Sequence, residues 1–161
     1  MSEIHCDSEP AINSSSPQNA CSVVRLHLCF GWWLLLVSLT LGIALEVMLG
    51  LKSLWYVDVS NETRRDMLSL AHTHGTLLAL VNIAFSWTVT RLPEWNAGNL
   101  KIASRCLLAA SLLMPLGFFL GGFFPSEGDP SLGILLLPAG AVFLLVAILL
   151  TAIAVRCCKK A

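Results

Sequence analysis

The segment LSLAHTHGTLLALVNIAFSWTV, residues 68–89, decides the class of fold. It matches the about 20 residues that a helix needs to cross a hydrocarbon layer, and it contains no Asp, Glu, Lys or Arg. Two histidines, His72 and His74, lie near its start. Because a charged group near the centre of a membrane helix costs at least about 2.5 kcal/mol, ionisable residues in such a segment usually have a function.

The composition of the whole chain is that of a membrane protein. Of its 161 residues, 56% are hydrophobic and 12% are charged, whereas charged residues make up about a quarter of a soluble domain. Ten basic residues balance ten acidic ones, so the basic surface of a nucleic-acid-binding protein is missing and we expect no nucleic-acid partner. Phosphate-binding loops and nucleophile elbows are also absent from the sequence. We therefore assign no catalytic residue and expect no enzymatic activity from the chain alone.

Four apolar segments predict four transmembrane helices, at about residues 27–49, 68–89, 102–124 and 132–155. Backbone groups in lipid must bond within their own segment, which favours helices. We therefore predict an all-α fold, a four-transmembrane-helix bundle over residues 25–161. Residues 1–24 are rich in Ser, Asn, Glu and Pro, and we expect a disordered polar tail there.

The basic residues predict the orientation of the bundle. An even number of spans places both termini on one side, and seven of the ten Lys and Arg residues flank that side. The positive-inside rule then predicts cytoplasmic termini in a plasma (inner) membrane. The first span taken alone favours the opposite orientation, because Arg25 precedes it while Lys52, Arg64 and Arg65 follow it.

Small and polar residues follow one face of each of the first two spans. They are His27, Gly31, Ser38, Gly42 and Glu46 in the first span, and Ala71, Gly75, Ala79, Asn82 and Ser86 in the second. Because small residues let membrane helices approach closely, we predict that both faces point into the bundle. The third span carries Pro115, which is expected to kink it, and a Gly117–Gly121 pair at the GxxxG spacing.

Glu46, His72 and His74 form the candidate site. Glu46 lies near the end of the first span and the histidines lie near the start of the second. At about 1.5 Å per residue, all three fall at a similar depth, within roughly 10 Å of the outer boundary. A contact between Glu46 and His72 would let the carboxylate orient the imidazole or let both bind a cation. Because residues two apart point in nearly opposite directions, a regular helix does not direct His72 and His74 to one metal ion.

One function that fits this site is binding of haem or a transition metal. His72 or His74 would be an axial haem ligand, or both would join Glu46 as metal ligands. Arg64 and Arg65, one to two turns away, would suit haem propionates. Two histidines and one glutamate are one ligand short of a closed zinc site, so zinc would need water or a second subunit.

Two other functions remain open. Without a cofactor, the same residues would form an interhelical hydrogen bond, and the chain would be a structural or assembly subunit with its small-residue faces against partner helices. A proton or small-solute pathway would require His27 and Asn82 to continue the polar line across the membrane. The expected partners are the lipid bilayer and either further copies of the chain or a larger membrane complex.

The segment Ala71-His72-Thr73-His74-Gly75 resembles the AH-x-H segments of small bacterial membrane proteins. Those proteins are grouped with subunit I of haem-copper oxidases and with nitric-oxide-response haem membrane proteins. The resemblance implies that His72 or His74 is a haem or copper ligand. It covers about a dozen residues, and the chain has fewer helices and histidines than an oxidase core, so the resemblance does not imply oxygen chemistry.

Overall fold

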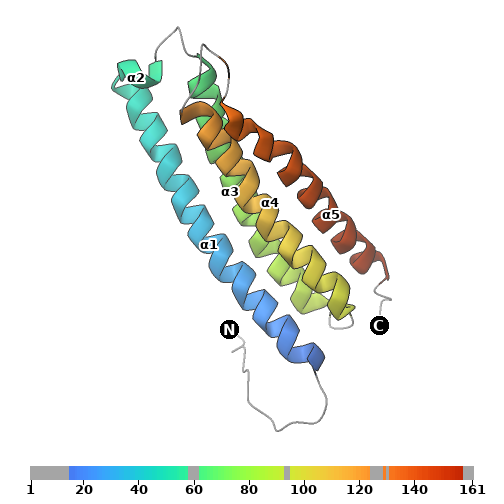
Figure 1. Cartoon of the computed structure of the whole chain (residues 1–161). Helices are drawn as coiled ribbons and strands as arrows, with labels where there is room; N and C mark the ends of the chain where they lie inside the picture. The colour runs from blue at the N-terminus through green and yellow to red at the C-terminus, as the bar shows by residue number, and fades with distance from the viewer. Residues whose placement is uncertain (1–14, 58–61, 93–94, 124–128, 130, 158–161) are drawn as a thin grey trace.

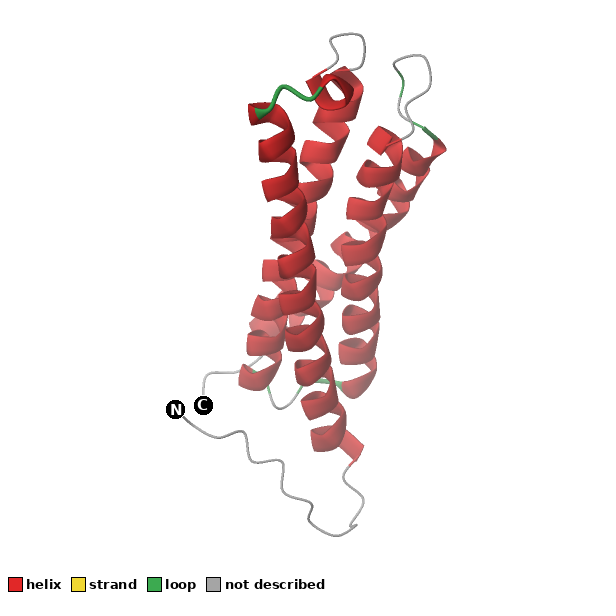
Figure 2. Cartoon of the chain, turned by 90° about the vertical axis from the view of Figure 1, so that its left-hand side faces the viewer, coloured by secondary structure: helices red, strands yellow, loops and turns green. Residues whose placement is uncertain are grey.

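The computed structural model describes residues 15–57, 62–92, 95–123, 129 and 131–157. Its elements are α1 (Ser15–Gly50), α2 (Leu54–Val57), α3 (Glu62–Arg91), α4 (Ala97–Phe123), η2 (Leu132–Leu135) and α5 (Leu136–Cys157). Within the described residues, four helical segments are long and apolar enough to cross a membrane, namely Ala20–Gly50, Glu62–Arg91, Ala97–Phe123 and Leu132–Cys157. The predicted all-α four-helix bundle is confirmed (Figures 1 and 2).

The first helix is longer than the sequence predicted. It begins at Ser15, so residues 15–24, which composition assigned to the polar tail, are helical. Pro17 falls in the first turn, where a helix needs no backbone N–H donor. A helical turn that precedes the hydrocarbon layer leaves no trace in hydropathy, because it does not have to be apolar. Residues 1–14 of the predicted tail lie outside the described residues.

The four long helices pack in the order α1, α3, α4, α5. Each contacts the next, and a smaller contact joins α1 to α4. In Figure 1, α1 and α5 lie at opposite edges of the bundle, and the beginning of α1 is at the same end as the end of α5. Both edge helices expose large apolar side chains, such as Trp33 of α1 (64% exposed) and Leu145 of α5 (70% exposed). In a bilayer these side chains would contact acyl chains.

The predicted small-residue faces of the first two spans pack against each other. A Cβ added to Gly31 would lie 2.8 Å from Ile83 Cγ1 and 3.1 Å from Ala79 O, so the backbones of α1 and α3 are very close there. Further along the same interface, Ser38 lies against Gly75. The prediction that these two faces point into the bundle is confirmed for all their residues except Glu46.

The predicted GxxxG spacing of the third span also marks a close contact. Gly117 and Gly121 of α4 lie against the turn that begins the last span, where Gly133 and Leu137 are their neighbours. Pro115 lies inside α4, and the helix continues past it to Phe123.

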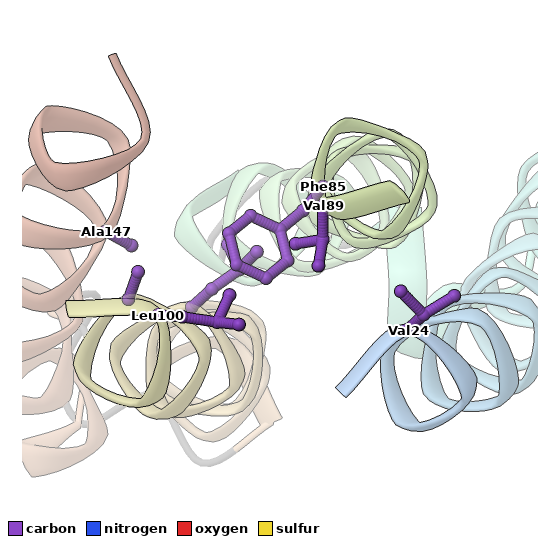
Figure 3. Close-up of a cluster of buried hydrophobic side chains, with 7 residues drawn as sticks. Val24, Phe85, Val89, Leu100 and Ala147 are labelled. Carbon is purple, nitrogen blue, oxygen red and sulfur yellow. The ribbon is translucent and has the colours of Figure 1, made fainter. Parts of the chain in front are cut away.

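A cluster of buried apolar side chains holds the four helices together near the end of the bundle where α5 ends. It consists of Val24, Phe85, Val89, Leu100, Ala103, Leu107 and Ala147. Figure 3 shows that these side chains come from all four long helices, with the Phe85 ring of α3 extending toward Leu100 of α4. A smaller cluster of Leu45, Tyr56 and Leu68 lies at the opposite end.

Candidate functional site

His72 lies at the interface of α3 with α1. Its Nδ1 is 2.8 Å from the backbone carbonyl oxygen of Ser38. A carbonyl oxygen only accepts hydrogen bonds, so Nδ1 carries a proton, and in the neutral ring Nε2 has the free lone pair. No hydrogen bond to Nε2 occurs within the part of the chain that the structure describes. The imidazole is thus held through one nitrogen and available through the other.

Gly42 of α1 provides the space for this ring. A Cβ at this position would lie 2.6 Å from Nδ1 and 2.8 Å from Nε2 of His72. Side chains in proteins essentially never come so close, so any larger residue at this position would displace the imidazole. The glycine and the carbonyl of Ser38, one turn away on the same helix, together fix where the ring lies.

A groove of about 530 Å³ opens beside His72. Its lining residues are Leu39, Gly42, Ile43, Leu45, Glu46, Val47, Tyr56, Ser69 and His72. Three of the apolar lining residues, Leu39, Ile43 and Val47, are exposed, so the groove opens on the outer face of α1. Its size falls within the roughly 300–1,000 Å³ of small-molecule sites, and it combines apolar walls with a few polar groups as such sites do.

The turn that follows α1 places Tyr56 in the wall of this groove. Lys52 adopts a left-handed conformation (φ 49°), and the amide of Ser53 donates to Met48 O at 2.9 Å, which is the Schellman pattern that ends a helix. The short helix α2 follows and buries Tyr56, which is 6% exposed. Burial raises the pKa of the Tyr56 phenol above its ordinary value, so the phenol is neutral at physiological pH.

Charged groups from two elements also act on the Tyr56 phenol. Besides burial, the carboxylates of Glu46 and Asp66 raise its pKa, whereas the guanidinium of Arg65 lowers it. Glu46 and Arg65 therefore lie within electrostatic range of the end of the groove that contains Tyr56.

The prediction that Glu46 faces the bundle interior is wrong. The side chain is exposed, and the inward position next along α1 from Gly42 is taken by Leu45, which packs with Tyr56 and Leu68. Glu46 and His72 do line the same groove, in agreement with the similar depth predicted for them. Within the described residues, no hydrogen bond or ion pair joins the carboxylate to the imidazole.

His74 points toward a different helix. Its Nδ1 is 2.9 Å from Leu70 O in its own helix, and its ring lies 4.6 Å from the ring of Phe118 in α4. The prediction that His72 and His74 diverge is confirmed. Among the described residues, no group of three or more His, Cys, Asp or Glu side chains could hold a metal ion.

Arg64 and Arg65, the two arginines of the candidate site, interact with different groups. Nη1 of Arg64 donates to the carbonyl oxygen of Trp55 at 2.7 Å, and its guanidinium carbon lies 4.7 Å from the Trp55 ring centroid. Arg64 thus fastens α2 to the start of α3. Arg65 is the arginine that acts on the groove, through Tyr56.

A second polar cluster, which sequence reasoning did not find as a unit, lies inside the bundle. His27 of α1 and Asn82 of α3 are both 0% exposed, and His27 Nδ1 lies 2.6 Å from Asn82 Oδ1. His27 Nε2 lies 2.8 Å from Ser104 Oγ in α4. Asn82 Nδ2 donates to Leu78 O and to Ser111 Oγ, each at 2.7 Å.

The direction of each hydrogen bond in this cluster follows from its partners. Asn82 Nδ2 donates twice, so Oδ1 is the acceptor and His27 Nδ1 must donate to it. In the neutral ring, Nε2 of His27 then accepts from the hydroxyl of Ser104. Ser111 Oγ donates to Leu107 O at 2.7 Å and so accepts from Asn82. The cluster satisfies the histidine and the asparagine completely and connects three helices.

The helical spans define a small integral membrane protein. No protein-family profile, characterised protein or solved structure that was compared with the chain matches it.

Proposed function

We propose that this membrane protein binds haem in the groove between α1 and α3, with His72 as an axial ligand. The observation that carries the proposal is the bond from His72 Nδ1 to Ser38 O, which leaves Nε2 without a hydrogen-bond partner on a ring that lines the groove. Histidines that bind metals characteristically donate their other ring N–H to a carbonyl or carboxylate, which fixes the ring and the tautomer.

Haem suits this site better than a bare metal ion does. Haem iron takes only one or two axial ligands from the protein. A zinc or copper ion bound by protein alone would require three or more side chains, and His74 lies against α4 instead of the groove. A transition metal held by His72 and Glu46 would need water or a second chain to complete its ligands.

The residues that line the groove also suit haem. Leu39, Ile43 and Val47 offer an apolar surface to a porphyrin ring. Arg65 is the candidate partner for a propionate, because Arg64 is already engaged with Trp55. The resemblance of the AHTHG segment to haem-binding and copper-binding membrane proteins implies the same role for a histidine here.

We further propose that the groove faces the outer side of a plasma membrane and that both termini are cytoplasmic. The excess of Lys and Arg on the side of the termini supports this orientation. A ligand in the groove would then be reached from the outer leaflet or the outer aqueous phase.

The structural-subunit alternative has less support. It required the small-residue faces of the first spans to meet partner helices, but Gly31, Ser38 and Gly75 are used within the chain itself. A partner helix would have to use the outer faces of α1 or α5. The pathway alternative keeps one favourable observation, since His27 and Asn82 lie on the same α1–α3 interface as His72.

The absorption spectrum of protein purified in detergent tests the haem proposal. We expect a haem Soret band in protein produced with haem available, and metal analysis should give iron in proportion to protein. His72→Ala should lose the band while keeping its helical circular dichroism, and His74→Ala should retain it. A wild-type protein that takes up neither haem nor metal, or a band that survives in His72→Ala, would reject the proposal.

A further inference from the structure

Thr76 of α3 differs from five other threonines of the spans. The hydroxyls of Thr40, Thr73, Thr88, Thr90 and Thr151 each donate to a carbonyl three or four residues earlier in their own helix. The Oγ1 atom of Thr76 is buried and has no hydrogen-bond partner within the described residues. Because a buried hydroxyl without a partner is costly, such a group usually bonds to an ordered water.

The position of Thr76 places this hydroxyl at the interface with α1. His72 lies one turn before it and Ala79 three residues after it, and both contact α1. The three residues therefore lie on one face of α3. Thr76 sits between the groove at His72 and the buried cluster of His27 and Asn82.

Polar partners for a water are present around this hydroxyl. Ser38, which is 4% exposed, places its Oγ against Gly75, the residue next to Thr76. The backbone carbonyl of His72, one turn before Thr76, does not receive the threonine hydroxyl and keeps a lone pair available. A buried water needs two to four polar partners, and we take Thr76, Ser38 and this carbonyl as the candidates.

We propose that Thr76 Oγ1 binds a water molecule between α1 and α3, in the middle of the membrane-spanning bundle. This water lies on the α1–α3 interface, between His72 and the buried cluster of His27 and Asn82. The inference does not depend on haem, because it rests on Thr76 and Ser38 and not on the free nitrogen of His72.

The direct test is nuclear magnetic resonance on the full chain in detergent micelles. We expect a nuclear Overhauser effect between water and the methyl group of Thr76. The methyl group of Ala79, which is 0% exposed and on the same face, is the control and should show none. Absence of the effect at Thr76 would overturn the proposal, whatever the variants show.

The substitution Thr76→Val distinguishes a hydroxyl that binds water from one that has no hydrogen-bond partner, because valine keeps the shape of the side chain and removes its polar atom. If water is bound, the variant loses its bonds and the unfolding temperature should fall by about 2–4 °C. If the hydroxyl has no partner, its removal should leave that temperature unchanged or raise it, which would overturn the proposal. The matched control is Thr73→Val, whose exposed hydroxyl bonds only to Ser69 O at 2.8 Å. If Thr76→Val does not fold, the wild-type spectrum decides alone.

Discussion

His27 Nδ1 lies 2.6 Å from Asn82 Oδ1, and both side chains are completely buried between membrane-spanning helices. The bond joins α1 to α3, and the contact of His27 with Ser104 extends it to α4. Lipid offers no hydrophobic force that would draw apolar helices together, so close packing and polar contacts must set their register. The pair therefore fixes how three of the four spans align.

Replacing His27 should destabilise the fold. His27→Phe keeps an aromatic ring beside Phe85, whose centroid is 4.6 Å away, but leaves Asn82 Oδ1 and the Ser104 hydroxyl without their partner. We expect the free energy of unfolding in detergent to fall by about 1–3 kcal/mol. His74→Phe is the matched control, because His74 is only half-buried and bonds only within α3. Equal losses in the two variants would contradict this role for His27.

Combining two substitutions should reveal the coupling between His27 and Asn82. Because each single change disrupts the same bond, the loss in the double variant His27→Phe, Asn82→Leu should be smaller than the sum of the two single losses. We expect a difference of about 0.5–3 kcal/mol in the free energy of unfolding. Strictly additive losses would show that the two side chains stabilise the bundle independently.

Gly42→Ala should displace His72 without changing any polar group. The added Cβ would lie 2.6 Å from His72 Nδ1, so the ring must move and its bond to Ser38 O must weaken. We expect haem retention in purified protein to fall by about tenfold or more, as judged by the Soret band. Gly50→Ala is the control, because a Cβ at Gly50 has no neighbour within 4 Å. Unchanged retention in Gly42→Ala would mean that the position of the ring is unimportant.

The single tyrosine of the chain, Tyr56, allows a spectroscopic test of the groove. Its folded-state pKa is raised above the ordinary value of 10.0, chiefly by burial, so tyrosinate absorption should appear at higher pH in folded than in unfolded protein. Because the folded state holds the phenol proton more tightly, Tyr56 contributes stability that is fully present below pH 10. This contribution is lost as the pH rises through the folded-state pKa. Glu46→Gln removes one of the raising charges and should lower the titration midpoint. A midpoint at or below that of unfolded protein would contradict the burial of Tyr56.

Much of the fold followed from the sequence, because a membrane restricts it severely. Length and hydropathy predicted the four spans. Helical periodicity then predicted that Gly31, Ser38 and Gly75 face inward, because small residues mark close helix contacts in lipid. The divergence of His72 and His74 followed from the 3.6-residue period alone.

The remaining contacts depend on which helices lie side by side and how each is rotated about its axis. Helical periodicity does not determine either. Glu46 lies outside because Leu45 fills the inward position against Tyr56. Ser104 completes the His27 cluster only because α4 lies beside α3. His27 and Asn82 each lay on a predicted inward face, so the sequence indicated that the two side chains could meet. No sequence feature identified Ser104 or Ser111 as their partners.

Titration of haem into detergent-solubilised protein measures the affinity that His72 confers and so tests the role of this residue as the haem ligand. We expect a single site per chain in the wild-type protein and in His74→Ala. In His72→Ala we expect at least about tenfold weaker binding, which corresponds to about 1.4 kcal/mol or more. Equal affinities of wild-type protein and His72→Ala would show that His72 is not the ligand.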